Sequence, residues 1–188
     1  METQRAAKSL IICYNPLMQV VKAPNPKLRV KTKPVKKLNA GLINTLKEMI
    51  KLTKTFTDPE GVGLASTQVG LAESFFVAKN ETKFITVINP KIISNQKRTK
   101  KFFEGCLSVP NIWGEVVRFT NIKVSYLDEE GKTIVKPLTG LLAHIFQHEI
   151  DHLNGVLFSD RVLEQKGKFY KFTGKDKAGA DTFEEINI

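Results

Sequence analysis

Two histidines and a glutamate within five residues are the side chains of this chain best arranged for metal chemistry. His148 and His152 are four residues apart, and Glu149 follows the first histidine directly. On a helix this spacing places the two Cβ atoms on one face, about 5–6 Å apart, so both imidazoles can bind one ion. Glu149 can then take the proton of a water molecule that the ion activates. The pattern predicts a metallohydrolase centre; the alternative is a chance match on an amphipathic helix.

Catalytic metal sites usually take three protein ligands, so a third must come from elsewhere. His144 lies four residues before His148 and so repeats the spacing. At a rise of about 1.5 Å per residue, however, it lies about 12 Å from His152 along the helix axis, which is too far for both to bind one ion. We therefore expect His144 to line the pocket or to contact a ligand. The H-E-x-x-H-x-x-G-x-x-H pattern would place the ligand at Phe158, which cannot bind a metal. The third ligand must be a carboxylate or a cysteine. Cys106 is a better candidate than Cys13, which we expect to pack as a small hydrophobe.

The two histidines need a helix to carry them, and the surrounding sequence predicts one over residues 139–153. Apolar residues recur there with helical spacing, and Asn154-Gly155 is a typical helix end. By the same reasoning we expect a helix at 39–56, strands at 74–79 and 83–89, a hairpin of 121–127 with 133–135, and one short strand at 168–172. The rest of the tail after Glu164 resembles no packed element. Strands on either side of helices predict an α+β fold, and 188 residues fit a single domain.

The composition limits where such an enzyme would act. No apolar run approaches the roughly 18 residues of a membrane span, and the start of the chain lacks a secretory signal. Two cysteines suit a reducing cytosol, so we expect a cytoplasmic protein without membrane partners. The net charge is +10, with lysine clusters at 31–37, 97–101 and 166–177. These clusters either bind ribosomal RNA or are solvated surface. The absence of aromatic–basic interleaving argues against sequence-specific nucleic-acid binding.

Three separated segments, residues 61–68, 104–108 and 147–152, together resemble the signature motifs of the peptide deformylase family. Ser66 stands where the first motif usually has alanine. Residues 88–90 and 155–161 also resemble the family. The resemblance covers about residues 21–165, which we expect to form the catalytic domain. It leaves a lead segment at 1–20 and a C-terminal tail at 166–188, expected to be mobile, without a functional interpretation. It implies an α+β domain with mixed and antiparallel sheets around a central helix that carries the metal motif.

The family removes the formyl group from the initiator methionine of new bacterial and organellar proteins, so the resemblance implies N-formylmethionyl nascent peptides as substrates. It implies that Cys106, His148 and His152 hold one divalent metal ion, most often Fe(II), with Zn, Ni or Co as alternatives. Glu149 would be the general base. Gln68 and the backbone N–H of Leu107 would bind the oxyanion, although spacing alone would also fit Gln68 as a turn residue.

The resemblance also implies a peptide-binding cleft. Val62, Gly63 and Gly105 would supply backbone contacts to an extended substrate, as a strand added to a sheet edge. The slot for the methionine side chain would be lined by Val62, Leu141, His144 and Ile145. His144 departs from the family, where an aliphatic residue is expected.

Beyond the motifs, Arg118 resembles a family arginine that pairs with Glu104, the alternative being a solvated surface arginine.

Other functions compete with deformylation. A protease or amidase could use the same metal ligands, and a catalytically silent homologue could bind the ribosome transiently. Every residue that the chemistry needs is present, which argues against a catalytically silent homologue. Glu149 beside a ligand, and only three protein ligands, argue against a purely structural metal site.

Overall fold

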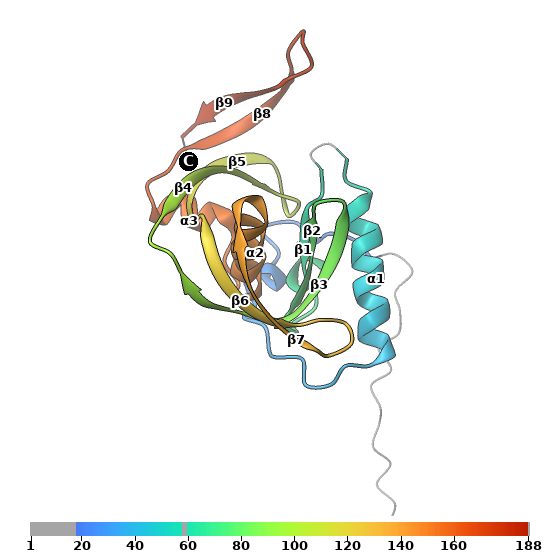
Figure 1. Ribbon diagram of the computed structural model, residues 1–188. Coiled ribbons are helices and arrows are strands. Elements are labelled where there is room, and N and C mark those ends of the chain that lie inside the picture. Colours follow the sequence, from blue (N-terminus) through green and yellow to red (C-terminus); the bar gives the residue numbers. More distant parts are fainter. Residues whose placement is uncertain (1–17, 58–59, 188) are drawn as a thin grey trace, which may run out of the picture.

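The computed structural model describes residues 18–57 and 60–187 (Figure 1). The helical elements are η1 (Pro26–Arg29), α1 (Ala40–Lys54), η2 (Ser66–Val69), α2 (Gly140–Leu153) and α3 (Phe158–Glu164). Among the residues described, no helix is both long enough and apolar enough to cross a bilayer. The predicted lead segment 1–20 and the predicted packing of Cys13 fall almost wholly outside the described residues.

Five antiparallel strands form the first sheet, in the order β1-β2-β3-β6-β7. They are β1 (Gly63–Ala65), β2 (Phe75–Asn80), β3 (Lys83–Asn95), β6 (Asn121–Leu127) and β7 (Thr133–Thr139). Successive side chains of a strand point to opposite faces. In β2 this places Phe75 and Val77 in the core cluster of α1, whereas Phe76 and Ala78 lie in the cluster of α2. Both faces of this strand are therefore buried, and a helix covers each.

Four antiparallel strands form the second sheet, in the order β4-β5-β8-β9. They are β4 (Thr99–Cys106), β5 (Val109–Phe119), β8 (Phe169–Lys175) and β9 (Asp181–Ile186). Helix α3 packs against this sheet: Phe158 and Val162 contact Val116 and Phe169 in a third core cluster. Strand β4 is an edge of this sheet and β1 is an edge of the other, so each offers unpaired backbone groups.

Helix α2 lies between the two sheets (Figure 1) and contacts strands of both. Its Phe146 is fully buried and meets the ring of Phe76 edge to face, with centroids 5.0 Å apart. Burying a phenylalanine side chain stabilises a fold by roughly 1.5–3 kcal/mol. The helix that carries the metal motif is thus fixed from its apolar side, which leaves its other side for the site.

The elements confirm most of the sequence predictions and overturn one. The α+β class, α1, α2, β2, the start of β3 and the β6–β7 hairpin are as expected. The prediction of a single short strand followed by an unpacked tail is wrong. Strand β9 pairs with β8 from Phe169↔Ile186 to Lys175↔Asp181, and β8 joins β5. Strand β9 escaped notice because its segment alternates weakly and is rich in acids, and only pairing with β8 stabilises it.

Candidate metal centre

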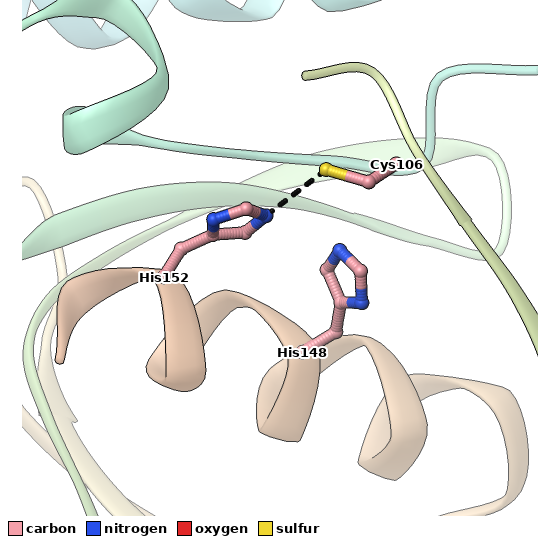
Figure 2. Close-up of side chains that lie close together, drawn as sticks. All are labelled: Cys106, His148 and His152. Atoms are coloured by element: carbon pink, nitrogen blue, oxygen red, sulfur yellow. Dashed lines mark hydrogen bonds between the residues drawn. The ribbon is translucent and has the colours of Figure 1, made fainter. Parts of the chain in front are cut away.

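Three side chains from two elements converge beside α2 (Figure 2). His148 and His152 lie one turn apart on the helix, and Cys106 stands at the end of β4. Their ligand atoms lie within 4.8 Å of one another, and His152 Nε2 is 3.2 Å from Cys106 Sγ. The structure therefore brings together the three residues that the motifs singled out as ligands.

The chemistry of these side chains fits a divalent ion. His148 Nδ1 lies 2.9 Å from Glu104 Oε2; assigned as the donor there, it leaves the lone pair of Nε2 free for a metal. Burial raises the pKa of the Cys106 thiol, but His152 and His148 outweigh burial and hold that pKa well below its usual range. A thiolate with two imidazoles accepts iron, zinc, cobalt or nickel, so these ligands do not select one metal.

Glu104 lies behind His148 and is held from three directions. Its carboxylate accepts hydrogen bonds from Arg118 Nε at 2.8 Å and Arg118 Nη2 at 3.0 Å. His144 Nε2 and His148 Nδ1 approach its two oxygens at 2.7 and 2.9 Å. Burial raises the pKa of Glu104, but the hydrogen bonds from the histidines and Arg118 lower it far more, so it stays ionised. The predicted pairing of Arg118 with Glu104 is confirmed, and Arg118 is 6% exposed rather than solvated.

Asp151 extends this buried ionic chain, and sequence reasoning gave it no role. Arg118 Nη1 donates to Asp151 Oδ2 at 2.5 Å, and Arg161 binds the same carboxylate through Nε at 3.0 Å and Nη2 at 2.6 Å. This series of contacts between charged side chains runs from His148 through Glu104, Arg118 and Asp151 to Arg161 on α3. Its partners are 10 to 44 residues apart, so no local pattern could reveal them.

Glu149 is buried beside the ligands, and none of the residues that the structure describes makes a hydrogen bond to its Oε2. Burial is the main cause that raises its pKa to about 7; the nearby histidines oppose the shift. A carboxylate with that pKa can both accept and release a proton near neutral pH. Gly63 makes room for it, because a Cβ at position 63 would clash with Glu149 Oε1. This is a second reason for glycine there, besides close approach of a peptide.

Gln68 points its amide nitrogen toward the thiolate. Its Nε2 is 3.4 Å from Cys106 Sγ and 3.2 Å from Ser108 Oγ, while its Oε1 accepts from the N–H of Ala65 at 2.8 Å. Ser108, which the sequence reasoning did not single out, also donates its N–H to Cys106 Sγ at 3.4 Å.

A short segment before η1 ties the Gln68 turn to the cysteine loop. The N–H of Val21 donates to Gln68 O at 2.7 Å, and the N–H of Ala23 donates to Ser108 O at 2.8 Å. The relative position of the amide and the thiolate is therefore set by contacts between distant parts of the chain.

A cavity of about 200 Å³ opens over these groups, between the edge strands β1 and β4. Its walls include all six residues that the sequence reasoning assigned to substrate binding: Val62, Gly63, Gly105, Leu141, His144 and Ile145. Gln68, Leu107, Cys106, His148 and Glu149 also line it. Phe103 and Trp113, which the sequence reasoning did not assign, also line the cavity.

His144 and Phe158 lie outside the group of ligands, as expected. His144 stacks on Phe102 with ring centroids 4.2 Å apart and reaches Glu104, so it both lines the cavity and supports His148. Phe158 is 1% exposed and belongs to the core cluster of α3. The structure therefore agrees with the rejection of the longer metalloprotease pattern.

Comparison with known proteins gives one consistent family. The family model described as polypeptide deformylase matches residues 17–168. A peptide deformylase of Thermotoga maritima is 42% identical over 142 residues, which cover 76% of this chain and 85% of the relative. One of Mesorhizobium japonicum is 38% identical over 172 residues, covering 87% and 96%.

Solved structures agree. The crystal structure of the Thermotoga maritima peptide deformylase superposes with a TM-score of 0.74 at 39% identity, covering 78% of this chain and 98% of that one. A peptide deformylase from Synechococcus elongatus in complex with actinonin gives a TM-score of 0.73 at 35% identity, covering 86% of both chains.

Proposed function

The chain belongs to the polypeptide deformylase family, and we propose that Cys106, His148 and His152 hold its metal ion while Glu149 moves the protons of the reaction. The protein is a hydrolase that removes the N-formyl group from the initiator methionine of nascent polypeptides and releases formate. The observation that carries the assignment of residues is the convergence of the three ligand side chains beside a buried glutamate, at the floor of a cavity between two edge strands.

We propose Fe(II) as the native ion, on the family resemblance, with Zn, Ni or Co able to replace it. When bound, the ion supplies Lewis-acid chemistry, which makes a water molecule acidic enough to attack an amide near neutral pH. Glu104 and Arg118 hold His148 in the orientation that presents its Nε2, and the low pKa of Cys106 keeps its sulfur anionic. Glu104 and Arg118 thus fix the position of His148, and the thiolate is the form of Cys106 that binds a metal.

Glu149 serves as general base and then as general acid. It accepts the proton of the attacking water and delivers it to the amine that leaves as the C–N bond breaks. Its burial raises its pKa to about 7, so neither transfer is strongly uphill at neutral pH. Gly63 keeps the space that this carboxylate needs.

Gln68 Nε2 and the backbone N–H of Leu107 stabilise the oxygen of the formyl group as it gains negative charge. Neither donor changes charge, and Gln68 is held by Ala65 on one side and Ser108 on the other. Fixed donors of this kind act where charge develops, and removal of one typically costs roughly 3–4 kcal/mol in the barrier.

The peptide lies extended between the edges of β1 and β4, bonded to the backbone of Val62, Gly63 and Gly105. The methionine side chain enters the slot formed by Val62, Leu141, His144 and Ile145. We further propose a cytoplasmic enzyme that meets its substrate at the ribosome, with the lysine clusters as a transient contact to RNA.

Formate release from formyl-Met-Ala-Ser by protein loaded anaerobically with Fe(II) tests the function, with acetyl-Met-Ala-Ser as control. Release from the formyl peptide alone is expected. Cleavage of the acetyl peptide or of internal bonds would indicate the related amidase or protease, and no release from metal-replete protein would indicate a silent homologue.

The ligand set is tested apart from activity. We expect Cys106→Ser to abolish the sulfur-to-metal charge-transfer band of the Co(II)-loaded protein and to weaken Co(II) binding more than the 10–100-fold typical of outer-sphere changes. An unchanged spectrum would remove Cys106 from the ligands.

A further inference from the structure

The side chain of Lys22, in the short segment before η1, reaches the residue that follows the cysteine of the metal centre. Its Nζ donates a hydrogen bond to Leu107 O at 2.5 Å. The same ammonium lies 5.7 Å from the centroid of the Phe56 ring, a distance at which the face of an aromatic ring attracts a cation. Lys22 is exposed, yet two contacts from separate parts of the chain hold its charge at one place.

The backbone on both sides of Lys22 is also fixed. The N–H of Val21 donates to Gln68 O at 2.7 Å, and the N–H of Ala23 donates to Ser108 O at 2.8 Å. These two bonds bring Lys22 to the cysteine loop before its side chain makes any contact. The contact with the loop therefore costs only the ordering of one side chain.

The carbonyl that Lys22 binds belongs to the same peptide group as an N–H that binds the thiolate. Leu107 supplies the carbonyl oxygen, and Ser108 supplies the N–H, which donates to Cys106 Sγ at 3.4 Å. A peptide group is planar and conjugated, so a cation at its oxygen polarises the N–H and makes it a stronger donor. The ammonium of Lys22 and the thiolate of Cys106 thus lie at the two ends of one series of hydrogen bonds.

A hydrogen bond to the sulfur affects any ion that the sulfur holds. Figure 2 shows Cys106 Sγ directed toward His152 of α2, and the N–H of Ser108 reaches the same sulfur from the loop. A donor lowers the energy of the sulfur lone pairs, so the thiolate gives less charge to a bound ion. The ion is then a stronger Lewis acid, which favours the chemical step of an amide hydrolysis.

We propose that Lys22 is a positioning residue of the metal centre, which strengthens the hydrogen bond from Ser108 to the Cys106 thiolate through the peptide group between Leu107 and Ser108. This rests on the proposed function and adds a residue to it. Because Lys22 acts through the sulfur ligand, its loss affects the chemical step rather than the binding of substrate. It should therefore appear in kcat and not in KM.

Lys22→Met tests the proposal, because it removes the charge and nearly keeps the length of the side chain. In the Co(II)-loaded protein we expect the sulfur-to-metal charge-transfer band to move to longer wavelength, since a weaker hydrogen bond leaves the sulfur electrons higher in energy. With Fe(II) and formyl-Met-Ala-Ser, kcat should fall about three- to tenfold at unchanged KM, less than the 10–100-fold typical of groups bonded directly to a ligand. Lys22→Arg keeps the charge and should restore both the band and kcat.

Lys36→Met is the matched control. It removes an exposed lysine from the same N-terminal segment, beside Val35, whose N–H is bonded to Asn89 of β3. The band, kcat and KM should all stay as in the parent protein. A shift of the band in this variant would show that net charge acts on the metal, rather than the contact of Lys22, and would overturn the proposal.

The outcomes separate this proposal from the proposed function. If the parent protein shows no sulfur-to-metal band or releases no formate, the proposed function fails, and the role of Lys22 fails with it. If the parent shows both and Lys22→Met keeps the parent's band, only the role of Lys22 is overturned. A raised KM at unchanged kcat would also overturn it, because Lys22 lines a neighbouring cavity and would then bind the substrate. Equal losses in Lys22→Arg and Lys22→Met would overturn it as well, since the charge would have no part in the effect.

Discussion

The ionic chain behind the metal ligands and the ion pairs of the C-terminal hairpin contain the same kinds of side chains in opposite surroundings. Glu104 and Arg118 are 2% and 6% exposed and share two hydrogen bonds. In the hairpin, the side chains of Lys168 and Glu185 are 56% and 47% exposed and meet at one contact of 2.8 Å. Water screens the second pair and cannot reach the first.

This difference shows which region of the protein depends on exact contacts between charged side chains. Water cannot compensate a buried charge that loses its partner. Each side chain in the series of ion pairs from His148 to Arg161 therefore depends on its neighbours. An exposed pair contributes little, because water replaces a lost partner. The metal centre should therefore respond steeply to substitutions that the hairpin tolerates, and the four changes below test this from the largest effect to the smallest.

Glu149→Ala should lower kcat about 10³- to 10⁴-fold while the protein still binds one metal ion, because the mutant loses the group that moves the proton. Formate release under saturating substrate and metal content by atomic absorption measure the two effects. Substantial turnover by the metal-loaded variant would remove Glu149 from the role of base.

Arg118→Ala should reduce the free energy of unfolding by about 3–5 kcal/mol, because it leaves Glu104 and Asp151 buried with fewer partners. Urea denaturation of the metal-loaded protein measures this. Lys168→Ala is the control from the exposed pair and should leave the unfolding midpoint unchanged. Equal midpoints for the two variants would contradict the comparison between the regions.

His144→Ile should weaken metal affinity about tenfold, since Glu104 loses one of its donors but keeps Arg118 and His148. Competition of Co(II) between the protein and a chelator gives the affinity. His144→Gln keeps a donor at this position and should recover most of it. If His144→Ile binds metal as tightly as the parent, Arg118 alone positions Glu104.

Phe183→Ala should lower the free energy of unfolding by only about 1 kcal/mol, the size of an aromatic contact at a partly exposed site. Urea denaturation again gives the value. A loss near that of Arg118→Ala would show that the hairpin is as essential to the fold as the buried ionic chain.

Local patterns predicted the parts of the site that lie within one element. The spacing of His148 and His152, the helix ends and the neighbouring Glu149 are all properties of a single turn of α2. The resemblance of three motifs then identified Cys106 and Gln68, which spacing alone had left open. Strands β1, β4, β5 and β9 and helix α3 were not predicted, because these short or irregularly patterned segments are stabilised by the elements on which they pack.

The order of the residues alone thus determined which side chains could do the chemistry, because helical periodicity sets the distance between residues four apart. Only the tertiary structure decided what surrounds them. The donors to Glu104, the placement of Asp151 between two arginines and the contact of Phe183 with Trp113 all join residues that are distant in sequence. Such contacts depend on how the two sheets pack around α2. Burial then raises the pKa of Glu149 and determines how much each ion pair contributes to stability.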